Sequence, residues 1–432
     1  MHNERDSLPK EVLEPILSSM EKDRPYLENL VGDLIRCYPT YIEDGSGIKV
    51  AQSIVRRELT SLGFQVKEVH VQEDVMRNHS LYTRVKDWGS RFEHYSPEKN
   101  LTQLGILHID DKAPTLALNG HVDVEPVFDP KTWKDPALWR SGSIVGDRIY
   151  GRGATDMLGG VAGLLFSLKH ILNSPLAPQV NILFHSVADE EIGGNGTLKC
   201  LIDGPKADWA LIAEPTGLTI NQSSLGFHHF QAKSWGTPVH MSQASEGQSA
   251  IDVAVEIHNR LNGLRAKLKQ VIVGVPGFEE SNVNPLVTGR IAGGQDPAVP
   301  AETCNLEGVL FSSPQQTRQD IQNLLEETLA SEPSLNASIS LSNMSFDGAI
   351  SSERTIPDAL IQAGKFLNRP LSETGFPSPC DMRLYIATGT PTTIFGPGHL
   401  TEAHVPNEFL LRDELFVFSQ VMAAFIAGLS KT

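Results

Sequence analysis

Apolar residues recur at helical spacing near the start of the chain. From Leu27 to Ile35 they fall on one face of a predicted helix, which Pro39 is expected to end. A second amphipathic stretch, 51–62, predicts another helix, and the residues that follow it, 64–69, predict a strand. The chain therefore begins with two helices that each have one apolar face to bury.

Further along, short uninterrupted apolar runs alternate with helical segments. The runs lie at 116–118, 180–184, 211–213 and 392–395. A helix is predicted at 158–172, between the first two runs. Uninterrupted apolar runs of this length are typical of strands that are buried on both faces of a sheet. The alternation predicts an α/β fold, with a mixed, largely parallel central sheet flanked by helices.

The pattern changes between residues 222 and 338. The predicted elements there are a strand, a helix, a helix and a strand, at 228–233, 249–261, 315–330 and 337–341, around a Gly/Pro-rich stretch. With two strands, not located individually, between the helices, the order strand, helix, strand, strand, helix, strand predicts an inserted α+β unit of ferredoxin-like type. A chain of 432 residues is also long for one core. We expect one domain at 1–221 and 339–432, and a second at 222–338.

The composition of the chain argues against some classes of binding partner. The formal net charge of -16 argues against nucleic acid and anionic membrane surfaces. No apolar stretch reaches the roughly 18 residues of a transmembrane helix, and Met1–Lys10 lacks the apolar core of a signal peptide. The scattered cysteines predict neither disulfides nor zinc fingers; they are Cys37, Cys200, Cys304 and Cys380. We expect a cytoplasmic protein.

Histidine and carboxylate residues follow the predicted buried strands. In strand order they are His121 with Asp123, Glu190 with Glu191, Glu214, and His404, and Asp156 stands at the start of the predicted helix. The carboxyl ends of parallel strands meet at one edge of a sheet, so these side chains should converge. Two histidines and three carboxylates suit two divalent ions such as zinc, manganese or cobalt. Two such ions lie about 3.5–4 Å apart, which requires a bridging carboxylate.

Each of these pieces also has a structural interpretation. A His-x-Asp sequence after a strand is commonly a structural pair, and an Asp-Glu-Glu run is commonly a solvated loop. The segment Gly151–Asp156 is compatible with a phosphate-binding turn, although it lacks a third glycine and a lysine. His108, followed by two aspartates, is a rival metal pair, but it precedes a strand. The convergence of several pieces on one sheet edge favours the metal site.

With these residues the sequence resembles a zinc metallopeptidase family. This family includes acetylornithine deacetylase, succinyl-diaminopimelate desuccinylase, aminoacylase and the glutamate carboxypeptidases. The matching motifs, in the family's order, are Asn119–Val124, Gly151–Met157, Asp189–Gly194, Ala213–Thr216, Gly396–Gly398 and Ala403–Glu408. The resemblance implies a zinc-exopeptidase-like catalytic domain and an inserted domain that acts as a lid and forms a homodimer.

The resemblance also implies a set of metal ligands. Asp156 would bridge two zinc ions, for which cobalt or manganese could substitute. His121 and Glu214 would complete one site, and Glu191 and His404 would complete the other. His404 is preferred to the nearby second histidine because only His404 lies in the family's Ala-His-x-Pro-Asn-Glu pattern.

Four further roles come from the same resemblance. Glu190 would be the general base, and Asp123 would fix the tautomer of the ligand histidine that precedes it. His240 would bind substrate in the partner subunit's site and stabilise the oxyanion. Arg383 would hold a substrate carboxylate, a task that suits its planar guanidinium.

The chain departs from the family pattern at two places. Val309 and Phe311 appear where relatives usually carry an Asp-x-Arg sequence on a lid strand, and Leu158 stands where many relatives have lysine. These changes weaken any claim for acetylornithine or succinyl-diaminopimelate as substrate, and they leave the metal ligands untouched.

Three functions follow as hypotheses. The first is a metal-dependent amidohydrolase that removes an acyl group from an N-acyl amino acid or a related small amine. The second is a dipeptidase or carboxypeptidase, which the ligand set does not separate from the first. The third is a non-catalytic metal- or ligand-binding relative, and the intact Glu190 argues against it.

Overall fold

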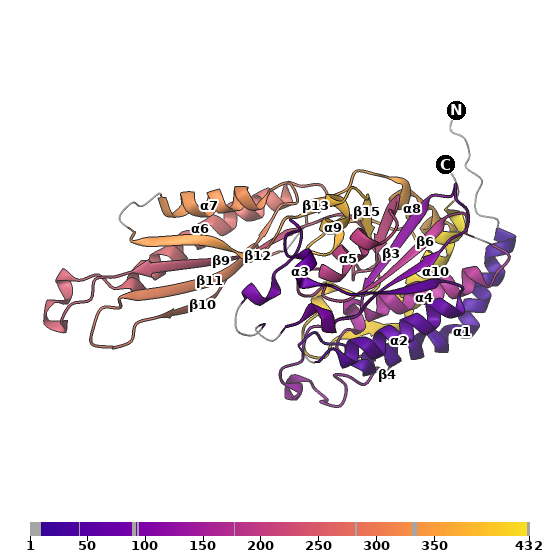
Figure 1. Cartoon of the computed structure of the whole chain (residues 1–432), viewed down its shortest axis with the longest axis horizontal. Helices are drawn as coiled ribbons and strands as arrows, with labels where there is room; N and C mark the ends of the chain where they lie inside the picture. Colours follow the sequence, from indigo (N-terminus) through magenta and orange to yellow (C-terminus); the bar gives the residue numbers. More distant parts are fainter. Residues whose placement is uncertain are drawn as a thin grey trace.

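The computed structural model describes most of the chain. The described residues are 10–42, 44–88, 92, 95–176, 178–280, 283–330 and 335–429; the amino-terminal segment predicted to lack a signal sequence lies largely outside them. They form a nine-stranded sheet, a four-stranded sheet and a three-stranded sheet. Figure 1 shows the four-stranded sheet projecting from the body that holds the other two. Among the described helices, none combines the length and apolar character needed to cross a bilayer.

The first two helices are α1 (Lys10–Cys37) and α2 (Ser46–Ser61). Helix α1 begins well before the periodic stretch from which it was predicted. The reason is that Leu13, Ile16 and Met20, all at most 5% exposed, continue the same apolar face into the core. Burial of that face outweighs the two prolines inside the helix.

The central sheet runs in the order β1-β2-β6-β3-β7-β15-β8-β13, with β14 paired to β8. Its strands are β1 Gln65–Val69, β2 Thr102–Leu107, β3 Thr115–His121, β6 Asn181–Val187, β7 Trp209–Ile212, β8 Ile220–Ser224, β13 Ala349–Ile350, β14 Glu373–Phe376 and β15 Thr392–Ile394. The middle strands β6, β3, β7 and β15 are parallel, whereas antiparallel pairs lie towards the edges. The predicted α/β fold with a largely parallel central sheet is confirmed.

Helices cover both faces of this sheet (Figure 1). One face carries α1, α2, α4 (Gly159–Leu172), α8 (Thr355–Phe366) and α10 (Arg412–Gly428), and the other carries α5 (Asn195–Asp203) and α9 (Met382–Ala387). Strand β3 serves both layers, because Leu116 and Leu118 join the first core and Ala117 joins the second. Burial on both faces explains the uninterrupted apolar runs in the sequence.

Short elements complete the body. The three-stranded sheet consists of β4 Ser143–Val145, β5 Arg148–Tyr150 and β16 Phe409–Leu411. The short helical turns are α3 Glu73–Met76, η1 Val85–Trp88, η3 Pro97–Lys99, η4 Pro130–Thr132, η5 Ala154–Leu158 and η7 Leu400–Glu402. Because β5 and β16 pair, they place the turn before α4 next to the loop that follows β15.

The four-stranded sheet and its helices form a unit that we call the projecting unit, residues 226–346. Its elements are β9 Gly226–Trp235, η6 Met241–Glu246, α6 Ala250–Val273, β10 Leu286–Gly293, β11 Thr303–Ser312, α7 Arg318–Ala330 and β12 Ala337–Phe346. The strand order is β10-β11-β9-β12, and every pair is antiparallel. Helices α6 and α7 share one apolar core with this sheet. The division into domains at 222 and 338 stays a prediction.

Strand β10 was not located from sequence. Its glycines, including Gly289 and Gly293, favour a loop when the local pattern is considered alone. Pairing with β11 over seven partnered positions makes the segment a strand. Tertiary contacts therefore override the local preference here.

Candidate metal centre

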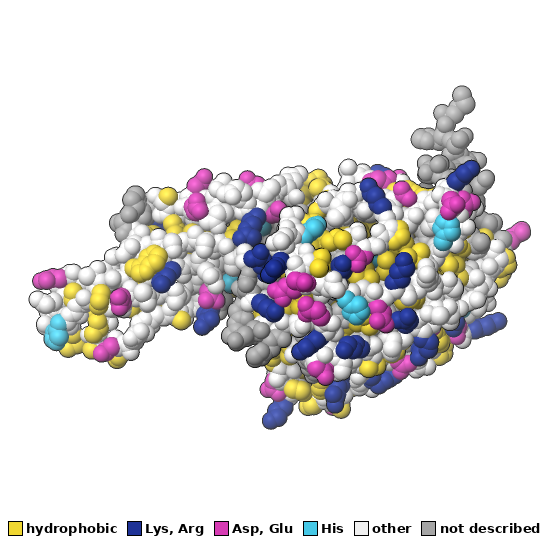
Figure 2. Space-filling view, in the orientation of Figure 1, with side chains coloured by type: hydrophobic (Ala, Val, Ile, Leu, Met, Phe, Trp, Pro, Cys, Tyr) yellow, Lys and Arg dark blue, Asp and Glu magenta, His cyan; other side chains and the backbone are white. Residues whose placement is uncertain are grey.

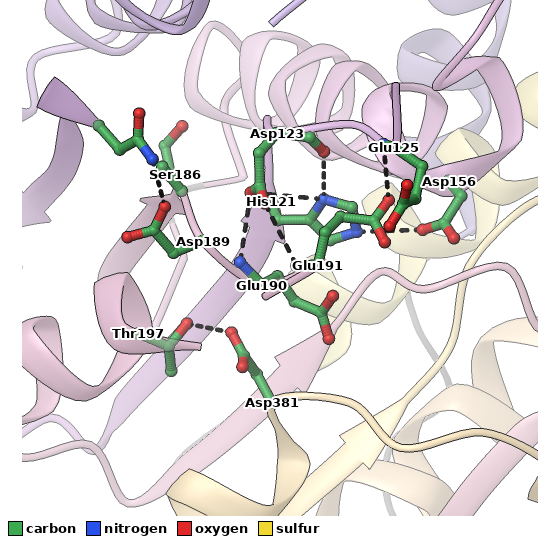
Figure 3. Close-up of polar contacts among 12 residues, drawn as sticks. His121, Asp123, Glu125, Asp156, Ser186, Asp189, Glu190, Glu191, Thr197 and Asp381 are labelled. Atoms are coloured by element: carbon green, nitrogen blue, oxygen red, sulfur yellow. Dashed lines mark hydrogen bonds and ion pairs between the residues drawn. The ribbon is translucent and has the colours of Figure 1, made fainter. Parts of the chain in front are cut away.

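Histidine and carboxylate side chains converge at the carboxyl ends of the parallel strands. His121 is the last residue of β3, Glu190 and Glu191 follow β6, and Glu214 follows β7. Asp156 lies in the turn before α4. Figure 3 shows the ring of His121 between the carboxylates of Asp123 and Asp156, with Glu190 and Glu191 beside it. The convergence expected from the sequence is therefore present in the structure.

Asp156 connects two groups of side chains. Its Oδ1 lies 3.0 Å from Nε2 of His121, which lies 3.8 Å from Oε1 of Glu214. Its Oδ2 lies 3.1 Å from Nε2 of His404, which lies 3.1 Å from Oε2 of Glu191. One carboxylate thus turns each of its oxygens towards a different histidine. This is the arrangement required of a carboxylate shared between two sites.

Ligand atoms of two overlapping sets are close enough to hold an ion. Those of His121, Glu190 and Glu214 lie within 4.8 Å of one another, as do those of His121, Asp156 and Glu191. Glu190 is therefore as close to the cluster as the predicted ligands. The four carboxylates of these sets line a cavity of about 380 Å³, which we call the reaction pocket.

Asp123 contacts this cluster through its backbone and its side chain. The Nδ1 of His121 lies 2.8 Å from the backbone carbonyl oxygen of Asp123 and 3.8 Å from its carboxylate. The carboxylate accepts hydrogen bonds from the backbone N–H groups of Glu190 and Glu191, at 3.3 and 3.2 Å. The Nδ1–H donates to the carbonyl, and loss of the Nε2 proton that bonds to Asp156 would give the tautomer that binds metal.

Burial and repulsion between neighbouring carboxylates make it less favourable for these side chains to ionise. Burial, followed by the charge of Glu214, raises the pKa of Glu190 well above its ordinary value. Burial also raises the pKa of Glu214, as does the nearby Asp156. Burial opposes ionisation of Asp156 too, but hydrogen bonds from His121 and His404 hold its pKa well below the usual range. Carboxylates outnumber histidines, so divalent cations fit the donor set and would offset the excess negative charge.

A buried ion pair holds the turn that carries Asp156. Arg152 Nη1 donates to Oε2 of Glu408 at 2.6 Å, and Oε1 of Glu408 accepts from the backbone N–H groups of Thr155 and Asp156. Neither Arg152 nor Glu408 has a role predicted from the sequence. Both nevertheless lie inside quoted motifs, each within four residues of a predicted ligand, and that position was the available signal.

Asp189 anchors the loop that carries Glu190. It is fully buried with a φ of 71°, and its carboxylate accepts hydrogen bonds from the Tyr95 hydroxyl and the Asn100 amide, both at 2.5 Å. These partners belong to the segment 72–100. The described part of that segment packs against the site, and its aromatic residues Phe92 and Tyr95 join an apolar cluster there.

Aromatic residues form part of the wall of the reaction pocket. Its aromatic lining residues are Tyr41, Trp88, Phe92, Phe227, Phe311, Phe346 and Phe376. They come from both the body and the projecting unit. Phe311, one of the two departures on β11, is among them, whereas Val309 pairs with His229 elsewhere along the strand. Leu158, the other departure, is fully buried in the apolar core.

Comparison with known proteins decides the family. The model of peptidase family M20/M25/M40 matches residues 117–428, which is most of the chain. This chain belongs to peptidase family M20/M25/M40. It is therefore a hydrolase that acts on amide bonds, and the family resemblance found in the sequence is confirmed.

Individual relatives of this M20 chain have different names. It is 25% identical to an N-formyl-4-amino-5-aminomethyl-2-methylpyrimidine deformylase from Halalkalibacterium halodurans, covering 96% of this chain and 97% of the relative. It is 29% identical to acetylornithine deacetylase from Proteus mirabilis, covering 68% and 74% of the two chains. Its fold is similar to that of a dinuclear metal-binding M20 peptidase from Bacillus subtilis, with a TM-score of 0.62 and 14% identity over 94% of this chain and 98% of that one.

The remaining predicted residues of this M20 chain lie away from the cluster or at its border. Arg383 lines the reaction pocket, where Nη2 donates to the carbonyl oxygen of Gly193 at 2.7 Å and the guanidinium lies 4.3 Å from the ring centroid of Phe346. His240 is exposed and precedes η6 in the projecting unit, where its Nδ1 lies 2.8 Å from Ser242 Oγ. The rival His108 pairs with an exposed aspartate and belongs to neither ligand set.

Proposed function

We propose that this M20 hydrolase is a metal-dependent amidohydrolase that removes a formyl or other small acyl group from an acylated amine. The observation that carries the proposal is the shared carboxylate of Asp156, with one oxygen towards His121 and the other towards His404. The names of the relatives, a deformylase and a deacetylase, support an acyl group on the substrate. A dipeptidase or carboxypeptidase activity is the second candidate.

The proposed cofactor is a pair of divalent cations. Asp156 would hold both, His121 and Glu214 would complete one site, and Glu191 and His404 would complete the other. Mixed imidazole and carboxylate donors favour zinc, with cobalt or manganese as substitutes. Such a pair polarises an amide carbonyl and lowers the pKa of water.

Glu190 is the proposed general base. It borders the same ligand set and lines the reaction pocket, so its carboxylate faces the space where an amide would bind. Glu190 would take a proton from the attacking water and deliver it to the nitrogen of the leaving amine. Asp123 would assist by holding the backbone of Glu190 and Glu191 and the ring of His121.

The aromatic wall favours a flat, weakly charged amine. Trp88 and Phe311 present large apolar surfaces to the reaction pocket, and Trp88 Nε1 is buried without a hydrogen-bond partner among the described residues. An indole N–H in this state would bind an acceptor atom of a heteroaromatic ring. An N-acyl amino acid remains the alternative, with Arg383 as its carboxylate partner, although that guanidinium already binds Gly193 and Phe346.

A homodimer through the projecting unit is part of the proposal. Figure 1 places η6, next to His240, near the end of the projecting unit, away from the body that carries the metal centre. His240 would therefore serve the site of a partner subunit, where it would stabilise the oxyanion. A cytoplasmic location also remains proposed, and it is consistent with four free cysteines.

Hydrolysis of a substrate panel tests the function. The panel contains an N-formyl aminomethylpyrimidine, N-acetyl and N-succinyl amino acids, and dipeptides, each assayed with zinc or cobalt. We expect cleavage of the formyl or acetyl compounds, its loss with a chelator and its return with metal. Cleavage of dipeptides alone would favour the second candidate, and full activity in a metal-free preparation would refute the metal mechanism.

A further inference from the structure

A second cavity adjoins the reaction pocket. Its volume is about 750 Å³, within the range of roughly 300–1,000 Å³ typical of small-molecule sites. It lies where the segment 77–84 of the body meets the end of β12 and the start of α7 in the projecting unit. Arg383 and Phe346 line both cavities, so they form a shared wall. We call this second cavity the arginine pocket.

The arginine pocket is strongly cationic in an acidic protein. Arg77, Arg84, Arg318 and Arg383 line it, and Asp347 is the one acidic side chain among its lining residues that the structure describes. Oδ1 of Asp347 already accepts a hydrogen bond from the backbone N–H of Arg318 at 2.5 Å. The arginine pocket therefore carries an excess of positive charge, although the formal net charge of the whole protein is -16.

Three of these arginines, Arg77, Arg84 and Arg318, are exposed, and none of the four forms an ion pair with a described residue. The charges of Asp381 and Glu190 nevertheless act on Arg383. Arg84 Nη2 lies 3.3 Å from the carbonyl oxygen of Arg77, and Arg318 Nη2 lies 3.5 Å from that of Leu341. Figure 2 shows basic side chains gathered where the projecting unit meets the body. Neighbouring like charges repel each other, so a bound anion would stabilise this arrangement.

An uncharged donor belongs to another residue that lines the same cavity. Oγ of Ser345, another lining residue, is buried and has no hydrogen-bond partner among the described residues. A hydroxyl in this state stabilises a ligand that brings an acceptor oxygen. Guanidinium groups bind carboxylate and phosphate oxygens in pairs, which matches the remaining donors.

We propose that the arginine pocket binds a small organic anion through a carboxylate or phosphate group. Arg77, Arg84 and Arg383 hold it from the body, and Arg318 and Ser345 hold it from the projecting unit. The anion therefore bridges the two parts of the chain next to the reaction pocket. It is either an acidic end of the substrate that extends past Arg383 or a separate anion bound beside the substrate.

Titration with inorganic phosphate tests this site. Phosphate is added to the metal-loaded enzyme at constant ionic strength and followed by calorimetry. The double variant Arg84→Gln/Arg318→Gln should bind it at least about tenfold more weakly than the wild type. The control is Arg290→Gln, which removes a charge from an arginine that is 70% exposed on β10 and does not line the pocket; its affinity should not change.

Three outcomes would overturn the proposal. They are absence of saturable binding to the wild type, equal affinity in all three proteins, and equal weakening in the control. Phosphate held only by the metal ions would give equal affinity. The single variants Arg84→Gln and Arg318→Gln, each at an exposed site, should each show part of the effect. Binding requires no turnover, so this test is independent of the proposed amidase activity.

Kinetics distinguish the two sources of the anion. Acylated amines are compared with and without a carboxylate or phosphate on the amine portion. If the anion is part of the substrate, the double variant raises KM for the acidic compound only, and phosphate competes with it. If the anion is separate, KM without phosphate is the same in variant and wild type for both compounds, while phosphate binding is still lost.

Discussion

Arg152 and Glu408 form an ion pair at 2.6 Å in which neither side chain is more than 5% exposed. Through its other oxygen, Glu408 accepts from the backbone N–H of Asp156 at 3.3 Å. The pair therefore connects the loop after β15 to Asp156 in the candidate metal centre. Glu408 would be left as an unpaired buried charge if Arg152 were removed.

We expect Arg152→Met to lower the free energy of unfolding by about 3–5 kcal/mol, as is usual when one partner of a buried pair is lost. Metal affinity should fall as well, because the turn that carries Asp156 loses its support. Urea unfolding with and without zinc measures both effects. The control, Arg56→Met, breaks an exposed pair with Glu68 and should cost at most about 1 kcal/mol. Equal losses in the two variants would contradict this prediction.

The general base can be tested without disturbing metal binding. Glu190→Gln should bind zinc with wild-type stoichiometry, yet lower kcat by about 10²–10⁴-fold, because the amide cannot take up the proton. Metal analysis and steady-state kinetics on the best substrate of the panel measure the two properties. Glu68→Gln, an exposed control on β1, should leave both unchanged. Retained turnover in Glu190→Gln would refute the assignment of the base.

A close approach of α4 to the sheet positions Glu214. A Cβ on Gly160 would lie 2.2 Å from the carbonyl oxygen of Ala213, the residue before Glu214, and 3.0 Å from its Cβ. Gly160→Ala should therefore lower the free energy of unfolding by about 1–3 kcal/mol through overpacking. It should also weaken metal binding by displacing Glu214.

The matched control for that substitution is another helical glycine. A Cβ on Gly263, inside α6, would have no neighbour within 4 Å. Gly263→Ala should raise the free energy of unfolding by about 0.5–1 kcal/mol, because alanine favours a helix over glycine. Thermal unfolding of both variants, with zinc titrations, gives the comparison. Similar behaviour of the two variants would contradict the close packing at Gly160.

His228 should make stability depend on pH. Burial, with a further contribution from Arg318, lowers the pKa of His228 from 6.5 to about 4. The unfolded chain then binds more protons than the folded chain between those values, so stability is lost as the pH falls from 6.5 to 4. The loss from this residue amounts to about 3 kcal/mol, at about 1.4 kcal/mol per pKa unit.

Substitution isolates that contribution. His228→Gln keeps a hydrogen-bonding group near Ser312, 2.9 Å from Nε2 in the wild type, and cannot titrate. Urea midpoints measured at intervals from pH 7 to pH 4 should fall less steeply in this variant than in the wild type. His70→Gln, at a position 53% exposed, should keep the wild-type slope. Parallel slopes in His228→Gln and the wild type would contradict the prediction.

The sequence alone determined the fold class and the histidine and carboxylate residues that meet at one edge of the sheet. Apolar runs at 116–118 and 180–184 predicted buried strands because both of their faces are covered by helices. Most of the candidate ligands could be recognised because they follow strands, and the carboxyl ends of parallel strands meet. His121 and Glu214 were therefore accessible from local pattern and chain order.

Only the tertiary structure decided how these residues are arranged and what surrounds them. In the fold, the two oxygens of Asp156 face different histidines. The backbone oxygen of Asp123 accepts the hydrogen bond from Nδ1 of His121. The tertiary structure also brought Trp88 to the reaction pocket and Arg318 to the arginine pocket. Such contacts join segments that are far apart in the chain and have no periodicity of their own. Side-chain packing between the body and the projecting unit fixes them, and local sequence does not encode that packing.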